Sequence, residues 1–307
     1  MEDQKLKRLL VFDANSVIHR AFHALPQLTT SKNEATQAVY GFCLVFLRSI
    51  RELKPTYVVA AFDYPAPTFR EKTYLEYKAK RPPAPPELYT QIPKTKEVLK
   101  AFAVPIFEKE GFEADDIIGT IAKKALRQQA FPKPEIIIIS GDADILQLVD
   151  KYTKVWLLRR GVKDIFLYDE EEVRRRYNGL APNQLVDLRA LRGDPSDNIS
   201  GIPGIGEKTA IELLLTFDTL EALYKALEEN EERVYKIKPK IRTLLRQGKE
   251  QAFLSRDLAK IRCDLELDFK LEDCKWGRFS KNEVKRVFLK FEFTTLINKI
   301  PEPIPEN

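Results

Sequence analysis

Acidic residues follow each of four successive apolar segments in this 307-residue chain. We predict that these segments are buried strands, and the carboxyl ends of parallel strands meet at one edge of a sheet, where ligands bind. Two further acids lie in a turn-rich stretch that begins at Arg192. The nine carboxylates that we expect to converge are Asp13, Asp63, Glu113, Asp115, Asp116, Asp142, Asp144, Asp194 and Asp197.

So many carboxylates at one edge indicate bound cations. A single acid after a strand commonly caps a helix or a turn, but crowded carboxylates repel one another unless cations neutralise them. No His or Cys lies within these clusters, and oxygen ligands alone favour Mg²⁺ or Mn²⁺ over zinc. Two ions about 4 Å apart would activate water and hold the leaving oxygen of a phosphodiester. We therefore predict a two-metal phosphoryl-transfer site.

A glycine-rich stretch, GIPGIGEKTA, follows the last two acids and lies between two predicted helices. It resembles a helix-hairpin-helix motif, which we place at 199–216. Gly204 and Gly206 allow a tight turn whose N–H groups face a phosphate, and Lys208 and Thr209 begin a helix whose positive end adds to the attraction. Such contacts recognise the nucleic-acid backbone and not its sequence. The alternative is an interhelical turn that binds no ligand.

Net charge agrees with a polyanionic partner. The chain carries +5, and without the nine carboxylates assigned to metal ions it would carry +14. A surface this basic suits nucleic acid. The carboxylates would then hold the ions that meet one phosphate, while the hairpin binds the same molecule further along.

Other sites for phosphate or nucleotides fit less well. A P-loop needs Lys directly after its last glycine, but Glu207 separates Gly206 from Lys208. A dinucleotide-binding fingerprint needs a third glycine where Thr209 stands. An aspartyl-phosphate phosphatase would leave most of the acids unexplained.

The spacing of the cysteines and the lengths of the apolar runs indicate the cellular compartment of the protein. Cys43, Cys263 and Cys274 match no metal-binding spacing, which favours reduced thiols. The first apolar run is too short for a signal peptide, and the longest other run is far short of a membrane span. We expect a cytoplasmic protein with no membrane contact.

The elements that would position these residues form an α/β fold. Strands are predicted at 8–13, 56–63, 104–111, 135–142 and 154–159. They alternate with helices at 15–25, 35–53 and 113–128, which predicts a largely parallel sheet with helices on both faces. From about residue 183 onward we expect only helices, at 183–198, 209–217, 220–229 and 238–247. This gives an α/β core at 1–180, a helical domain at 181–293, and a tail or linker at 294–307.

An insertion at about 65–88 interrupts the α/β pattern. It is rich in Lys, Arg, Tyr and Pro, and it is longer than an ordinary connection. Its composition leaves two interpretations open: a solvated surface segment, or a basic arch over the active site.

These motifs together resemble those of the 5′ nucleases, the family of the 5′→3′ exonuclease domain of bacterial DNA polymerase I and of flap endonucleases. The resemblance extends from about residue 8 to at least 293. It is carried by FDANSVIHRAFHAL, AVYGF, AAFDYPAPTFR, YKAKRPPAPPEL, FEADDIIGTIA, SGDADILQLV, LRGDPSDNISGIPGIGEKTA and SRDLAKIRCDL. One departure is Ala14-Asn15 where many relatives have a glycine after the first acid, and it changes no ligand.

The resemblance implies how the acids divide between two ions. The first site would use Asp13, Asp63, Glu113 and Asp115, with Asp116 close by. The second would use Asp142, Asp144 and Asp197, with Asp194 reaching its ion through water. No protein residue would be the nucleophile. The family's hairpin loop can also bind K⁺ through its carbonyl groups.

The resemblance also assigns roles in the insertion, which would form a helical arch that admits a single-stranded 5′ flap. Lys78 and Arg81 would be catalytic, stabilising charge on the scissile phosphate. Tyr77 or Tyr74 would stack on a base, and Arg70 would contact DNA.

The predicted function is therefore a structure-specific 5′→3′ exonuclease and flap endonuclease that acts on DNA and RNA primers in replication and repair. We expect a monomer, either free-standing or joined to or acting with a DNA polymerase. The alternatives are a metal-dependent ribonuclease of the PIN type, and a non-catalytic DNA-binding protein that uses only the hairpin.

Overall fold

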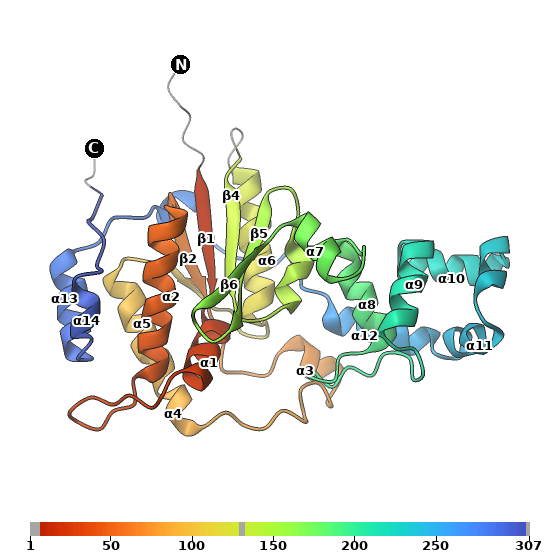
Figure 1. Ribbon diagram of the computed structural model, residues 1–307, viewed down its shortest axis with the longest axis horizontal. Coiled ribbons are helices and arrows are strands. Elements are labelled where there is room, and N and C mark those ends of the chain that lie inside the picture. Colours follow the sequence, from red (N-terminus) through yellow and green to blue (C-terminus); the bar gives the residue numbers. More distant parts are fainter. Residues whose placement is uncertain (1–6, 129–132, 305–307) are drawn as a thin grey trace, which may run out of the picture.

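A mixed six-stranded sheet forms the centre of the molecule, in the order β3-β2-β1-β4-β5-β6 (Figure 1). The computed structural model describes residues 7–128 and 133–304. Five strands run parallel, and β6 is antiparallel to β5. The strands are β1 (Arg8–Asp13), β2 (Tyr57–Ala61), β3 (Ile106–Phe107), β4 (Glu135–Ser140), β5 (Thr153–Arg160) and β6 (Asp164–Tyr168).

The strand register brings the acid-bearing ends together. Asp13, the last residue of β1, lies beside Ala61, the last residue of β2. On its other side, Phe12 of β1 pairs with Ile139 of β4. The strand order reverses between β1 and β4, and a crevice opens at such a switch point in doubly wound sheets. The acids that follow these strands therefore meet at this crevice.

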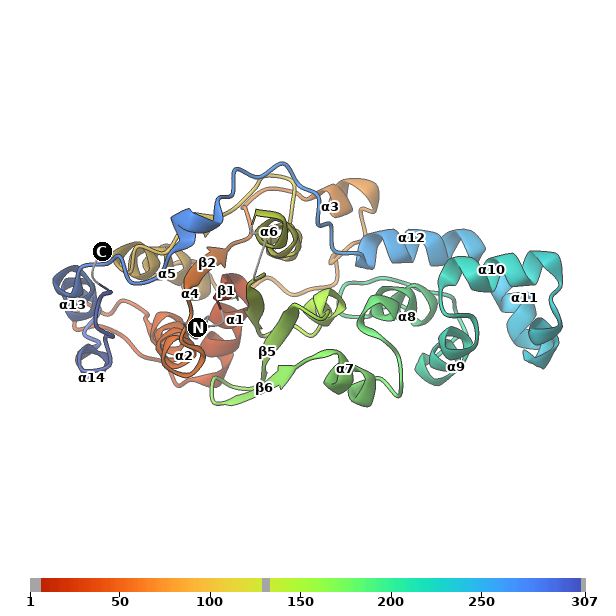
Figure 2. The same ribbon diagram turned by 90° about the horizontal axis from the view of Figure 1, so that it is seen from above.

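Helices cover both faces of the sheet, as predicted. On one face lie α1 (Ala14–Ala24), α2 (Gln37–Leu53) and α5 (Gln91–Ala101), and α6 (Ala114–Gln128) lies on the other (Figure 2). Successive β1 residues point to opposite faces, so Phe12 packs with Phe46 of α2, their ring centroids 5.2 Å apart. Val11 belongs to the opposite core, which includes α6. Because both faces are covered, the parallel strands are apolar throughout.

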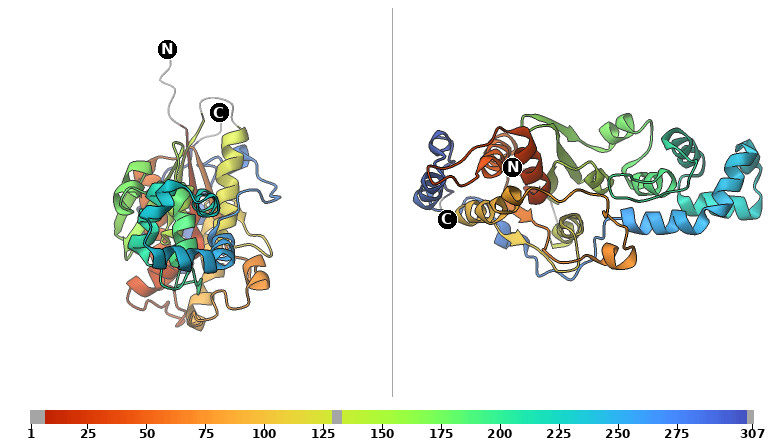
Figure 3. Two further views of the ribbon diagram at one scale, coloured as in Figure 1. Left: turned by 90° about the vertical axis from the view of Figure 1, so that its right-hand side faces the viewer. Right: turned by 90° about the horizontal axis from the view of Figure 1, so that it is seen from below.

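A helical domain projects from one side of the core (Figures 1 and 3). Its helix α12 packs on α8 and returns the chain toward the core. The helices between the sheet and this return are α7 (Glu170–Arg176), α8 (Leu185–Arg192), α9 (Glu207–Phe217), α10 (Leu220–Glu229), α11 (Pro239–Gln247) and α12 (Lys249–Ala259).

The last segment of the chain folds back onto the core, so the prediction of a tail or linker at 294–307 is wrong for its described part. Trp276 donates its backbone N–H to Thr56, 2.9 Å away at the start of β2. Helices α13 (Lys281–Lys290) and α14 (Thr294–Ile297) pack on the α2 and α5 side of the core. Residues 305–307 lie outside the described part.

Several local elements differ from the sequence predictions, and helices α5, α7, α12 and α13 were not predicted. Strand β6, which pairs antiparallel with β5, was not predicted. The helix expected at 183–198 ends at Arg192, because Gly193 takes a φ of 79° that a helix does not permit. The arch segment is helical only in α3 (Phe69–Thr73) and α4 (Pro86–Tyr89), with turns and extended chain between them (Figure 1). Within the described ranges, no helix has both the length and the apolar character that crossing a membrane requires.

Candidate active site

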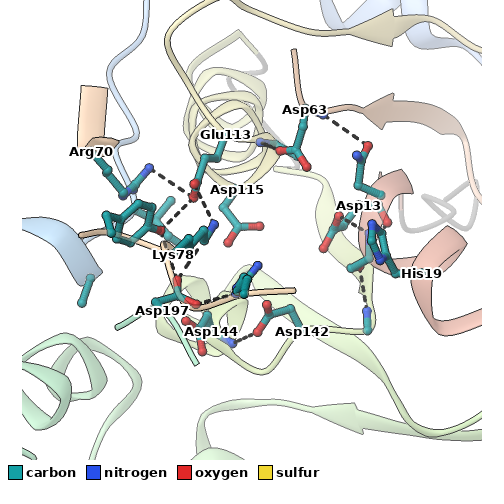
Figure 4. A pocket seen from close by; sticks show the side chains of 18 of the residues that line it. Asp13, His19, Asp63, Arg70, Lys78, Glu113, Asp115, Asp142, Asp144 and Asp197 are labelled. Carbon is teal, nitrogen blue, oxygen red and sulfur yellow. Dashed lines mark hydrogen bonds and ion pairs between the residues drawn. The ribbon is translucent and has the colours of Figure 1, made fainter. Parts of the chain in front are cut away.

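A cavity of about 370 Å³ lies at the carboxyl edge of the sheet and brings most of the predicted acids together (Figure 4). It is also lined by the arch residues Tyr77, Lys78 and Arg81. The acids that line it are Asp13, Asp63, Glu113, Asp115, Asp142, Asp144 and Asp197. Asp116 and Asp194 do not line it.

Asp13 is held at the floor of the cavity by two serines. It caps α1 by accepting the N–H of Ser16 (3.1 Å) and accepts the hydroxyl of Ser140 at the end of β4 (2.6 Å). Burial raises the pKa of Asp13 to about 6, although these hydrogen bonds oppose the change. Neither serine was predicted from the sequence as a site residue. Ser16 lies three residues after Asp13, and Ser140 lies two residues before Asp142; this closeness to the acids in sequence was the available signal.

Two more carboxylates lie at the start of α6. Asp63 accepts the N–H of Ala114 at 2.8 Å. Burial raises the pKa of Asp63 despite this bond. The pKa of Asp115 is raised well above its ordinary value by burial and then by the negative charges of Asp13 and Asp142. The carboxylates therefore crowd one another as predicted.

Arg189 of α8 is a cation at this site that sequence analysis missed. It is buried, forms an ion pair with Asp144, and its Nε lies 3.4 Å from Oδ2 of Asp194. Burial raises the pKa of Asp144 to about 7, although Arg189 opposes the change. Asp194 also accepts the N–H (3.0 Å) and hydroxyl (2.6 Å) of Ser196. Nothing in the local sequence of α8 marks Arg189 as a partner of these acids.

The two predicted catalytic cations lie among the acids. Lys78 Nζ is 2.6 Å from Oε1 of Glu113 and 3.9 Å from Oδ2 of Asp197. Arg81 forms an ion pair with Asp197. Burial favours the neutral form of Asp197, but Lys78 and Arg81 outweigh it and lower the pKa of Asp197.

Tyr77 is not free to stack on a base. Its side chain is buried, and its hydroxyl lies 3.1 Å from Asp197 Oδ2 and 3.2 Å from Glu113 Oε2. The prediction that it stacks is therefore wrong for this arrangement. Tyr74 is half-buried beside it, and stacking by Tyr74 stays a prediction.

Arg70 and Asp116 form a buried ion pair, which corrects the role predicted for each. Arg70 is 2% exposed and Asp116 is 0% exposed. Both Asp116 oxygens accept from the guanidinium, at 2.7 and 2.8 Å, and Arg70 also donates to the carbonyls of Leu258 (2.8 Å) and Lys260 (2.9 Å). Arg70 also lines the cavity, where its Nη1 lies 3.5 Å from Oε2 of Glu113, so its guanidinium is engaged by the protein's own carboxylates and carbonyls, and Asp116 lies outside the cavity.

The cavity contains side chains that divalent cations prefer as ligands, but these side chains are not arranged around a single ion position. In the described part of the chain, no three His, Cys, Asp or Glu side chains are close enough together to hold an ion. Lys78, Arg81 and Arg189 form ion pairs with Glu113, Asp197 and Asp144 respectively. The donors are all oxygens, several have raised pKa values, and lysine and arginine already neutralise others. This donor set fits Mg²⁺ or Mn²⁺.

The hairpin loop follows Ile199, which lines this cavity, and its role in binding a phosphate stays a prediction. Gly204 has a φ of 90°, and a side chain at Gly206 would meet open space. Gly206 precedes α9 and provides no side-chain cap, so the first N–H groups of that helix are available to an anion. Lys208 is exposed and Thr209 half-buried in its first turn.

Comparison with known proteins places the chain in a family. Residues 8–178 match the family model described as 5′-3′ exonuclease, N-terminal resolvase-like domain. Residues 180–282 match 5′-3′ exonuclease, C-terminal SAM fold. The chain belongs to the 5′-3′ exonuclease family. The predicted family and fold class are thereby confirmed.

Whole-chain relatives agree with this assignment. The chain is 43% identical to DNA polymerase I of Caldicellulosiruptor bescii, covering 95% of this chain but 33% of that protein. It is 37% identical to a 5′-3′ exonuclease of Aquifex aeolicus, covering 96% of each. The chain thus spans about a third of its DNA polymerase I relatives.

Solved structures share the fold. The bacteriophage T5 D15 flap endonuclease, in a pseudo-enzyme–product complex with DNA and metal ions, matches with a TM-score of 0.67 and 18% identity, over 93% of this chain and all of that one. The catalytic core of Rad2 in complex with DNA substrate matches with a TM-score of 0.60 and 15% identity, over 96% of this chain and 93% of that one.

Proposed function

We propose that this 5′-3′ exonuclease is structure-specific and hydrolyses phosphodiesters of DNA and RNA primers near the junction of a 5′ single strand with duplex. The observation that supports this most strongly is the meeting of seven carboxylates and two arch cations in one cavity beside a hairpin loop. Flap DNA is the proposed partner, in replication and repair. A monomeric state and a polymerase, fused or separate, stay predictions.

Two Mg²⁺ ions would be held by the acids that line the cavity, and Mn²⁺ would replace them. Such ions supply Lewis-acid stabilisation and activate water. The first would be held by Asp13, Asp63, Glu113 and Asp115, and the second by Asp142, Asp144 and Asp197. Asp116 is withdrawn from this set, and Asp194 would act through Arg189 and Ser196 or through water.

The arch cations Lys78 and Arg81 would stabilise negative charge on the scissile phosphate. Lys78 and Arg81 already neutralise Glu113 and Asp197, so a phosphate in the cavity gives them a second anionic partner at short range. Charge that develops on the phosphate would be stabilised by these groups without their moving far. Burial favours the neutral form of Lys78, but Glu113 and Asp197 outweigh it and raise the pKa of Lys78, which keeps it charged for this role.

The hairpin would bind duplex backbone through the uncapped start of α9, with Lys208 beside it. K⁺ bound by the loop carbonyls would add positive charge there. The loop between Asp197 and Gly204 would fix the distance between this contact and the cut.

Cleavage of a labelled 5′-flap duplex tests the function, compared with the matching single strand and blunt duplex, in Mg²⁺ or EDTA. We expect Mg²⁺-dependent cutting within about one nucleotide of the junction. Equal cutting of single-stranded RNA with the flap ignored would favour the PIN-type ribonuclease. Binding without cutting would favour the DNA-binding protein.

Lys78→Ala is expected to slow single-turnover cleavage by about 10²-fold while flap affinity changes little, because the ammonium acts on charge that develops during the reaction. The control is Lys80→Ala, an exposed neighbour on the same segment. A wild-type rate in Lys78→Ala would remove the catalytic role from Lys78.

A further inference from the structure

The arch segment is tied to the loop that precedes the hairpin through main-chain atoms, and these ties involve no carboxylate. They connect the arch, which would hold the single strand, to the loop before the hairpin, which would bind the duplex. The three hydrogen bonds run from Lys78 N to Asp197 O (2.9 Å), from Arg81 Nε to Ser196 O (3.1 Å) and from Asn198 Nδ2 to Glu76 O (2.7 Å).

The loop that receives the arch is closed on itself. Asp194 N donates to Ile199 O (2.8 Å), and Ile199 N donates to Asp194 O (2.9 Å). Gly193 and Gly201 then meet backbone to backbone, because a Cβ at Gly201 would lie 2.1 Å from Gly193 N. The hairpin begins at this second glycine. The loop at 194–199, to which the arch is hydrogen-bonded, is therefore also held against the start of the hairpin.

Asn198 is the tie that is separate from the acids and cations. Its side chain does not line the cavity, and its φ of 57° is a left-handed conformation that asparagine tolerates well. That conformation directs its amide to Glu76 O. Lys78 lies two residues after Glu76 and has a φ of 56°. This backbone conformation is rare for a residue with a long side chain, so the surrounding contacts must hold it.

We propose that Asn198 is a positioning residue: it fixes the arch to the hairpin loop and so selects which phosphodiester bond reaches the acidic cavity. This proposal rests on the proposed function. Loss of the tie would let the arch shift relative to the duplex contact, and a small misplacement of the reacting bond lowers the rate strongly.

The test compares two variants on the 5′-flap duplex in Mg²⁺. Asn198→Gly keeps the positive φ without the donor, and Asn198→Asp keeps the shape but places an acceptor against Glu76 O. We expect the share of products cut at neighbouring bonds to rise about threefold and the single-turnover rate to fall about tenfold. The control is Asn178→Gly, because Asn178 is exposed and has a similar φ of 51°.

A second measurement does not depend on cleavage. Hydrogen exchange of the free protein should quicken about tenfold at the Lys78 amide in Asn198→Gly, and not in Asn178→Gly, because the bond to Asp197 O opens more often.

The outcomes separate the two proposals. A wild-type protein that ignores the flap contradicts the proposed function and this inference with it. A wild type that cuts the flap, with both Asn198 variants cutting at the same bond, overturns this inference alone. A slower rate with an unchanged cut position and unchanged exchange at Lys78 also overturns it, because that pattern indicates a merely structural side chain.

Discussion

Asp142→Ala should lower the single-turnover cleavage rate by on the order of 10³-fold, because an ion held less well costs several kcal/mol of transition-state stabilisation. Its carboxylate is lightly engaged: it accepts the N–H of Asp144 at 2.8 Å and otherwise faces the cavity. Binding of flap DNA, measured by fluorescence anisotropy in EDTA, should be unchanged or tighter. One negative charge that repels phosphate has gone.

Two control variants separate charge from shape. Asp142→Asn keeps an oxygen acceptor for Asp144 N but removes the charge, and we expect it to lose activity nearly as fully. Glu170→Ala removes an exposed acid at the start of α7 and should leave cleavage at the wild-type rate. Loss of flap binding in parallel with activity in both Asp142 variants would count against a metal role for this residue.

Arg70→Met should cost about 3–5 kcal/mol of unfolding free energy, because it leaves Asp116 as an unpaired charge in the interior. The side chains of the pair are 3% and 0% exposed. Denaturant unfolding measures this loss. A DNA-contacting Arg70, as the sequence analysis predicted, would give the opposite pattern: wild-type stability with weakened DNA binding.

A double-mutant cycle with Asp116→Leu isolates the pair. The coupling free energy between Arg70→Met and Asp116→Leu should be on the order of 2 kcal/mol, since an apolar replacement of both charges removes the unpaired one. Arg159 provides a matched control, because its ion pair with Asp164 is exposed at 45% and 38%. Arg159→Met should cost less than about 1 kcal/mol. Additive losses for Arg70 and Asp116 would contradict a buried pair.

The acids were predictable because their positions depend on strand ends alone. Asp13, Asp63 and Asp142 each follow an apolar segment, and parallel pairing then places them side by side. The partners of the acids were not predictable in this way. Arg70 meets Asp116 across 46 positions and Leu258 across 188, and no local pattern marks such a contact.

Strand β6, at the edge of the sheet beside β5, was not predicted for a different reason. The five residues of β6 follow a turn at Gly161 and form an edge strand that is half-buried along most of its length. They therefore lack the continuous apolar run of the parallel strands. Likewise, the return of residues 276–304 to the core depends on scattered aromatic residues whose partners lie in α2 and α5.

That return affects how the protein folds during synthesis. Phe46 and Phe102 are synthesised early, but the aromatic rings that cover them lie more than 170 positions later, at Trp276 and Phe279. Trp276 packs on Phe46 at 5.7 Å between ring centroids, and Phe279 packs on Phe102 at 5.1 Å. A nascent chain that has released only its first 180 residues therefore exposes this aromatic surface to water. The two matched family regions are consecutive in sequence, yet the first cannot complete its core until the ribosome has passed the second.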